Sequence, residues 1–395
     1  MTNIDKRRRT LMKTGGAVGI AGLAGCISSP SDSGNDGGDG SGDGSGDETE
    51  NTSSEGTDNG SSGEGGETTN VGMVYATGGL GDNSFNDMAH MGIEQAKKEF
   101  NVQYQNAEPD SATDVESLQR QFAQSSSPSY DLICCIGYVQ TNSLVKNAGQ
   151  FPDQNFMLVD SVAEKESGDL VKNVANYTFK EQQGSFLVGH LAGQLTQMDF
   201  SAGKGSTNPD EKTVGFVGGM EVPLIKKFEA GFKAGVAHAS EDIEVKTAYA
   251  GTYSDPVKGK EAAISMYDQG ADIVYHAAGG TGTGVFKAAN QKGRFAIGVD
   301  SDQSKAKGTA KFSNVILASM VKKVNKAVYR STKNVIDGNF KGGSVNTLGL
   351  EQGGIEAVYG ADLGSEIPDD VKSKVEESKQ AIIDGDIEVP TKPQQ

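Results

Sequence analysis

Aromatic and hydrogen-bonding side chains stand together at residues 82–86, where a glycine-rich segment leads into a helical pattern. Phe85 offers a flat apolar face, and Asp82 and Asn86 on either side of it offer hydrogen-bonding groups. In open parallel sheets, ligands bind beyond the carboxyl ends of the strands, where turns and helix N-termini gather. The segment therefore indicates a site for a flat organic ligand, although a helical phenylalanine is equally well explained as a core residue.

The same arrangement recurs later in the chain. Residues 71–96 align without gaps to residues 214–239, and this alignment pairs Phe85 with Phe228. An apolar strand, a turn and a helical phenylalanine repeated in register indicate two similar halves. If the two halves face each other, their rings can close on a flat ligand from both sides.

The ends of two further strands repeat as well. FMLVDS at 156–161 resembles AIGVDS at 296–301, so Asp160 corresponds to Asp300. A carboxylate at the end of a strand either caps the next helix or faces the cleft. For Asp300 we favour the cleft.

A glycine-rich segment and the two cysteines beyond Cys26 limit the kinds of ligand that the chain can bind. HAAGGTGTGVF (276–286) follows a strand and opens a helix, so its N–H groups can hold ligand oxygens. It has no third glycine of a dinucleotide fingerprint, and the chain has no GK[ST] phosphate loop, which disfavours nucleotide hydrolysis.

Cys134 and Cys135 are adjacent and point to opposite faces of a strand, so we expect small buried side chains there. No metal site and no cofactor are expected.

From Val71 onward, short apolar runs alternate with amphipathic ones, as in parallel sheets flanked by helices. About 325 residues exceed what one hydrophobic core usually supports, so we expect two lobes. The predicted strands are 71–75, 102–106, 131–136, 155–159, 213–218, 244–249, 272–276 and 295–299. The predicted domains are a first lobe at 70–178, to which the chain returns after about 315, a second lobe at 179–314, and shared crossover and C-terminal elements at 315–395.

The N-terminus has the composition of an export signal. Basic residues precede an apolar run that is too short to span a bilayer and that ends in LAGC, residues 23–26. This tetrapeptide resembles a lipobox, in which Cys26 becomes the lipidated first residue, and the adjacent arginines suggest the twin-arginine route. Residues 27–69 hold eleven acidic residues and no Lys or Arg, so we expect a disordered tether.

The charge of the chain excludes some partners. The formal net charge is −17, and the chain contains no Trp, a composition that resembles haloarchaeal proteins. With no basic stripe to neutralise phosphates, the chain is not expected to bind nucleic acid.

Several motifs in order, GDNSFND, VGFVGGMEVPLIKKFEAGFKAGV, GADIVYHAAGGTGTGVF, IGVDSDQ and ILASMVKKV, resemble the basic membrane protein family of solute-binding lipoproteins. The resemblance runs from about residue 70 to about 360. That family includes purine nucleoside receptors of ATP-binding-cassette (ABC) importers. The resemblance implies a type I periplasmic-binding-protein fold, in which two α/β lobes joined by three crossovers close on a ligand in the cleft between them.

The resemblance also implies roles for particular residues. Phe85 and Phe228 would stack on the base, and Asp82 and Asn86 would read its edge. Asp300 would accept hydrogen bonds from the ribose cis-diol. The remaining ligand-binding positions implied in this way are Lys322, Gly279 and Gly280 at the sugar, and Asn142, which stands where relatives often carry a cleft aspartate.

We therefore expect a monomeric, lipid-anchored protein on the extracytoplasmic face of the cell membrane that hands a nucleoside to ABC permease subunits. A signalling receptor with the same cleft, or a binding protein for another small solute, is the alternative. An enzyme is disfavoured, because residues 70–110 lack the aspartate cluster that a calcium-dependent nucleosidase needs.

Overall fold

The computed structural model describes residues 67–393. The predicted export signal, the lipidation at Cys26 and almost all of the predicted tether lie outside these residues. The first strand begins at Thr69, two residues before its predicted start. All eight predicted strands are present, each within two residues of its predicted ends.

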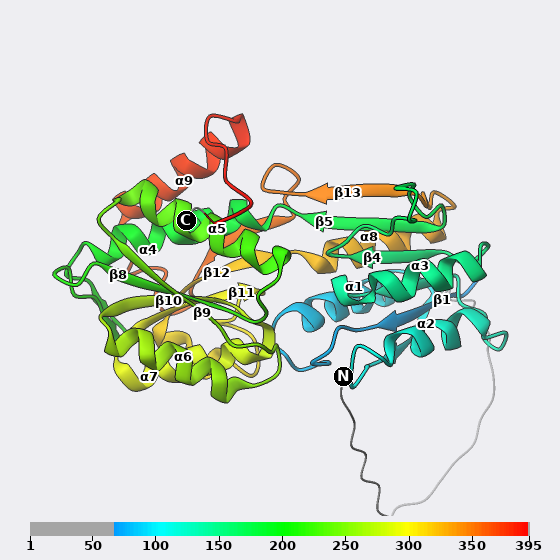
Figure 1. The fold of residues 1–395 in the computed structure, drawn as a ribbon, viewed down its shortest axis with the longest axis horizontal. Coiled ribbons are helices and arrows are strands. Elements are labelled where there is room, and N and C mark those ends of the chain that lie inside the picture. Colours follow the sequence, from blue (N-terminus) through cyan, green and yellow to red (C-terminus); the bar gives the residue numbers. More distant parts are fainter. Residues whose placement is uncertain (1–66, 394–395) are drawn as a thin grey trace, which may run out of the picture. The chain divides into compact units, whose positions relative to one another are not determined.

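The first sheet has six parallel strands in the order β13-β5-β4-β3-β1-β2 (Figure 1). Its strands are β1 (Thr69–Val74), β2 (Val102–Ala107), β3 (Leu132–Cys135), β4 (Phe156–Val159), β5 (Val174–Phe179) and β13 (Ser344–Leu348). The sequence pattern did not predict β5 and β13.

The second sheet has the order β14-β12-β11-β10-β8-β9, which repeats the first sheet strand for strand. Its strands are β8 (Thr213–Gly218), β9 (Glu244–Tyr249), β10 (Ala271–Ala277), β11 (Phe295–Asp300), β12 (Ile316–Lys322) and β14 (Ile355–Tyr359). Only β14 is antiparallel to its neighbour, β12. The internal repeat of the sequence thus corresponds to a repeat of topology.

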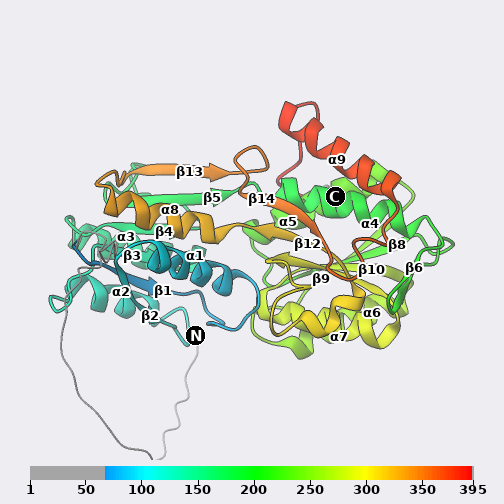
Figure 2. The ribbon, with the colours of Figure 1, turned by 180° about the vertical axis from the view of Figure 1, so that it is seen from behind.

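We call the first sheet with its helices lobe 1 and the second lobe 2. The chain crosses between them three times, after β5, after β12 and after β13 (Figure 2). Within the segment 315–395, β12 and β14 belong to lobe 2, whereas β13 belongs to lobe 1. A separate hairpin joins β6 (Ser201–Ala202) to β7 (Gly205–Ser206).

Helices pack in pairs against the sheets, as alternating strands and amphipathic segments require. In lobe 1 they are α1 (Phe85–Glu99), α2 (Val115–Gln124), α3 (Thr141–Gln150) and α8 (Val324–Ile336). In lobe 2 they are α4 (Glu181–Thr196), α5 (Pro223–Ala239), α6 (Pro256–Asp268), α7 (Thr283–Lys292) and α9 (Asp369–Asp384), and short 3-10 turns occur at η1 (Tyr138–Gln140), η2 (Gly279–Gly282) and η3 (Ala310–Val315). None of the helices within residues 67–393 is long and apolar enough to cross a membrane.

Neighbouring residues of the buried strands face different cores, as the period of two in a strand requires. In β3, Cys134 belongs to the core cluster that also contains Met88 and Ile93 of α1, whereas Cys135 packs with Phe122 of α2. Both cysteines are buried and free, which confirms the prediction for this pair.

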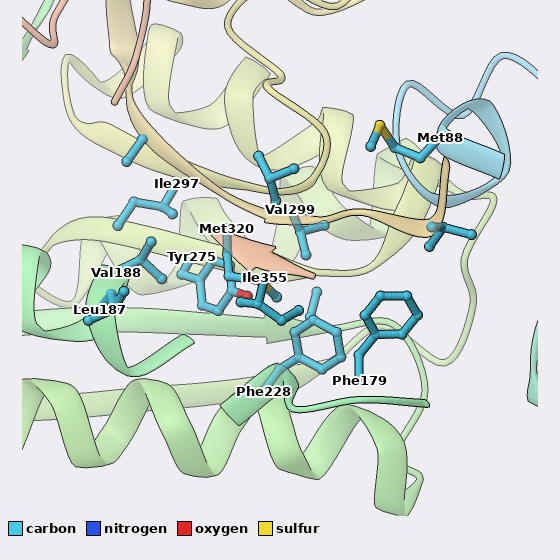
Figure 3. Close-up of a cluster of buried hydrophobic side chains, with 14 of the residues drawn as sticks. Met88, Phe179, Leu187, Val188, Phe228, Tyr275, Ile297, Val299, Met320 and Ile355 are labelled. Carbon is cyan, nitrogen blue, oxygen red and sulfur yellow. The ribbon is translucent and has the colours of Figure 1, made fainter. Parts of the chain in front are cut away.

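Close packing of α5 on α4 fixes the helix that carries Phe228. A side-chain carbon added at Gly231 would lie 2.1 Å from the Gln182 carbonyl oxygen, and one at Gly235 would lie 2.0 Å from that of Phe186. Only glycine allows the two backbones to approach this closely. Phe228 is 3% exposed and lies in the large core cluster beside Phe179 and Tyr275 (Figure 3).

Candidate functional site

A cavity lies between the carboxyl ends of the strands of the two lobes. Lobe 1 lines it with Phe85 at the first position of α1, with Tyr138 and with Asp160 after β4. Lobe 2 lines it with Phe228 and Tyr253. The lining is mainly apolar and aromatic with a few charged groups, which is typical of a small-molecule site.

Seven of the nine ligand-binding residues predicted from the sequence line this cavity, namely Asp82, Phe85, Asn86, Phe228, Gly279, Asp300 and Lys322. Asn142 and Gly280 are not among the lining residues. Asn142 is exposed in the first turn of α3. Gly280 is the next residue in η2. A side-chain carbon added there would lie 3.3 Å from the Tyr253 carbonyl oxygen and 3.9 Å from Asp82.

Lys322, the last residue of β12, has a buried ammonium group at the base of the cavity. Its Nζ lies 2.6 Å from Asp160 Oδ2 and 3.6 Å from Glu181 Oε1. Burial by itself would lower the pKa of Lys322, but Asp160, Glu181 and Asp300 raise it above the usual value. The lysine therefore remains charged and joins a carboxylate of lobe 1 to lobe 2.

Aromatic rings surround the same ammonium group. Lys322 Nζ lies 4.8 Å from the ring centroid of Phe85 and 5.5 Å from that of Phe228, and Phe179 is 5.3 Å away. Each ring attracts the cation through its negative face. The two distances also limit the separation of the Phe85 and Phe228 centroids to at most their sum, 10.3 Å.

Asp160 and Asp300 end corresponding strands and share a left-handed backbone, with φ angles of 68° and 64°. Few residues other than glycine adopt this conformation, and aspartate and asparagine do so most readily. Asp300 Oδ2 accepts a hydrogen bond from Ser84 Oγ of lobe 1 at 2.6 Å. Burial raises the pKa of the Asp300 carboxyl, and Lys322 and Ser84 partly offset that rise.

Asp82 and Asn86 direct most of their hydrogen bonds to the loop that they belong to. The Asp82 carboxylate accepts from the backbone N–H groups of Ser84 and Asn86, each at 2.9 Å. The Asn86 amide accepts from Ala76 N at 2.9 Å and donates to the Gly79 carbonyl at 3.0 Å. Burial raises the pKa of Asp82 to about 7, although the Asn86 and Ser84 N–H groups lower it. These two side chains thus build the turn that presents Phe85.

A short segment of lobe 1 is hydrogen-bonded to the loop after β11 in lobe 2. The Asn83 carbonyl accepts from Ser301 Oγ at 2.8 Å and from Gln303 Nε2 at 3.1 Å. Asn83 Oδ1 accepts from Gly308 N at 2.8 Å. Together with the pair of Ser84 and Asp300, these bonds hold the lobes against each other around the cavity.

Sequence reasoning did not assign ligand contacts to Asp160, Tyr138 or Tyr253. The repeat of VDS gave a signal for Asp160. Nothing in the sequence pattern marked the two tyrosines. Among residues 67–393, no group of three or more His, Cys, Asp or Glu side chains is arranged to hold a metal ion.

The comparisons with known proteins agree with this architecture. The family model described as ABC transporter substrate-binding protein PnrA-like, Bmp, matches residues 69–393. The chain belongs to the Bmp family. Members of this family are binding proteins of ABC transporters rather than enzymes, so a small-molecule ligand and permease partners follow.

Two relatives and one solved structure are similar to most of this chain. The ABC transporter nucleoside-binding protein BmpA of Lactococcus lactis is 35% identical over 80% of this chain and 87% of its own. An uncharacterised lipoprotein of Pyrococcus abyssi is 35% identical over 72% of this chain and 68% of its own. The crystal structure of an ABC transporter solute-binding protein from Aeropyrum pernix matches with a TM-score of 0.70, at 29% identity, over 83% of this chain and 94% of that chain.

Lys322→Met should lower the free energy of unfolding by about 3–5 kcal/mol, because it leaves Asp160 without its buried cation and leaves Glu181 only the partly exposed Lys227, 3.5 Å away. Burial raises the pKa of Glu181 and Lys322 lowers it, so without the lysine the Glu181 pKa rises further in the folded state, and the folded protein binds more protons than the unfolded one. The loss of stability should therefore grow as the pH rises from 5 to 8. Urea denaturation at several pH values measures both effects.

Lys146→Met is the matched control, because Lys146 pairs with Glu116 on the surface, where its side chain is 64% exposed. Its removal should leave stability nearly unchanged at every pH. An equally small effect for both variants would show that Lys322 does not organise the site.

Proposed function

We propose that this protein binds a nucleoside, with a purine base, between its two lobes and delivers it to the permease of an ABC importer. The observation that carries the proposal is that Phe85 and Phe228, one from each lobe, line the same cavity within reach of one buried ammonium group. Stacking on an aromatic ring is worth about 1–3 kcal/mol per base. A purine presents the larger face to such rings.

The charges around the cavity favour an uncharged ligand. Asp160, Glu181 and Asp300 are buried there, and Lys322 is the only fully buried cation that faces them within residues 67–393. A phosphate group would add negative charge to this set, which costs free energy in a buried site. A nucleoside therefore suits the cavity better than a nucleotide. The name of the Lactococcus lactis relative, a nucleoside-binding protein, supports the same ligand class.

Asp300 is proposed to accept hydrogen bonds from the sugar cis-diol. One of its oxygens already accepts from Ser84, which leaves the other for a ligand. Asp300→Asn should chiefly weaken binding of nucleosides with an intact cis-diol, and isothermal titration of ribonucleosides against their dideoxy analogues measures this. Equal weakening for both kinds of ligand would contradict the role.

Phe85→Ala should weaken nucleoside binding by about 1–3 kcal/mol, because one stacking partner is lost. Phe85 is only partly buried, so the free energy of unfolding without ligand should change little.

Phe228→Ala should weaken binding similarly and also destabilise the unliganded protein by about 3–5 kcal/mol, because Phe228 is also a core residue. Isothermal titration with adenosine, guanosine and inosine, together with urea denaturation, measures both quantities.

Phe100→Ala serves as the control, because Phe100 is a partly buried ring of lobe 1 that does not line the cavity. It should bind nucleosides as the unmodified protein does. Binding of amino acids or simple sugars with no binding of any nucleoside would contradict the nucleoside assignment. Normal affinity in folded Phe85→Ala would contradict stacking.

We further propose that lipidation of Cys26 anchors the protein on the extracytoplasmic face of the membrane. The LAGC sequence after a basic and apolar segment supports this, and the Pyrococcus abyssi relative is named a lipoprotein. Cys26→Ala should release the protein into the medium or leave an unprocessed precursor, because the acyl chains supply the membrane affinity. Fractionation of cells and mass measurement of the product test this. Unchanged membrane retention of a processed variant would contradict the anchor.

A further inference from the structure

Two polar atoms in the wall of the cavity are buried without a hydrogen-bond partner in the part of the chain from 67 to 393. They are the Tyr253 hydroxyl of lobe 2 and Asp160 Oδ1 of lobe 1. An unsatisfied buried polar group costs about 1–3 kcal/mol, and native proteins rarely keep one without a reason. Because both atoms line one cavity, a bound ligand is the natural partner for them.

The Tyr253 ring is held in place by its surroundings. A side-chain carbon at Gly219 would lie 2.4 Å from Tyr253 Cδ1, so glycine at that position makes room for the ring. The Tyr253 carbonyl accepts a hydrogen bond from Thr281 N at 3.0 Å, which ties its loop to η2. Burial raises the pKa of the phenol above its usual range, and the nearby Tyr138 and Asp160 add to the rise. The phenol therefore keeps its proton and can donate a hydrogen bond to a ligand.

Asp160 offers the complementary group. Its side chain is 4% exposed, and its Oδ2 accepts a hydrogen bond from Lys322 Nζ at 2.6 Å. Its Oδ1 points to no donor among the described residues. A carboxylate oxygen accepts hydrogen bonds and donates none, so Oδ1 can only be an acceptor. The cavity thus presents a donor from one lobe and an acceptor from the other.

We propose that Tyr253 and Asp160 together bind one hydroxyl group of the ligand. The Tyr253 phenol donates to the hydroxyl oxygen, and the hydroxyl donates in turn to Asp160 Oδ1. A hydroxyl satisfies both atoms because it accepts and donates at once, whereas a carbonyl can only accept. This inference rests on the proposed function, under which the hydroxyl belongs to the sugar of a nucleoside. Tyr253 is then a residue that determines specificity for that hydroxyl.

The experiment combines a protein variant with ligand variants. Dissociation constants are measured by isothermal titration for inosine, adenosine and guanosine, and then for the 2′-, 3′- and 5′-deoxy forms of whichever binds most tightly. Tyr253→Phe should weaken binding of the full nucleoside by about 3- to 10-fold, the loss expected for one neutral hydrogen bond. For one of the deoxynucleosides the variant and the unmodified protein should bind equally, because the partner hydroxyl is already missing.

Two further variants make the test decisive. Tyr130→Phe removes a phenol that donates to Gln105 at 2.5 Å in lobe 1, away from the cavity, so it should bind every ligand normally. Asp160→Asn keeps a residue type that tolerates a left-handed backbone. It also weakens the ion pair with Lys322, so its effect on binding should be smaller with the same deoxynucleoside than with the other two. If Asp160→Asn does not fold, Tyr253→Phe alone decides the matter.

Several outcomes would overturn the assignment. One such outcome is that Tyr253→Phe binds all ligands normally. The other is that it loses the same factor in affinity with all three deoxynucleosides, which would place its partner on the base. Either result contradicts the shared hydroxyl and leaves the nucleoside site intact. If the unmodified protein binds no nucleoside, the proposed function is wrong, and the hydroxyl assignment fails with it.

Discussion

The buried ammonium group of Lys322 is the constraint on which the site depends. Removing a cation from water costs several kcal/mol, and only well-placed opposite charges and hydrogen bonds offset that cost. Asp160 of lobe 1 and Glu181 at the start of α4 supply those charges, and three aromatic rings complete the surroundings. Since Lys322 ends β12 next to a crossing of the chain, this cluster fixes how the strand ends of the two lobes meet.

The repeated topology explains why the ligand-facing groups come in pairs. Each lobe ends a central strand in an aspartate with a left-handed backbone, and each supplies a phenylalanine from the helix after its first strand. The pairs have diverged in their partners, however. Asp160 pairs with Lys322, whereas Asp300 accepts from Ser84 across the lobes. The duplicated scaffold thus produces a cavity with two similar aromatic walls and two chemically different carboxylates.

Much of this architecture could be predicted from the sequence, because buried parallel strands are continuous apolar runs and the internal repeat indicates two similar halves. Strands β5, β12, β13 and β14 of the two sheets were not predicted. In β5 and in the edge strand β13, NYT and SVNT interrupt the apolar pattern. Phe85 and Phe228 were placed at the cavity because both follow a strand and a turn in register.

The roles of the polar residues depended on contacts that no local pattern records. Asp82 and Asn86 bond to their own loop, which adjacent sequence alone does not distinguish from ligand contact. Lys322 and Asp160 meet across 162 residues, and Glu181, at the start of α4, is fully buried beside them. The Asn142 prediction came from the resemblance to relatives, and in this chain that residue is exposed on α3.

The central claim is that the cavity between the lobes holds a nucleoside. Purification of the protein from its native membrane, followed by denaturation and mass spectrometry of the released small molecules, tests it without any choice of candidate ligand. The account predicts that a nucleoside is released in a ratio approaching one per protein chain, and that it is absent from Lys322→Met purified in the same way. Release of a sugar, an amino acid or a phosphorylated nucleotide in that ratio would contradict it.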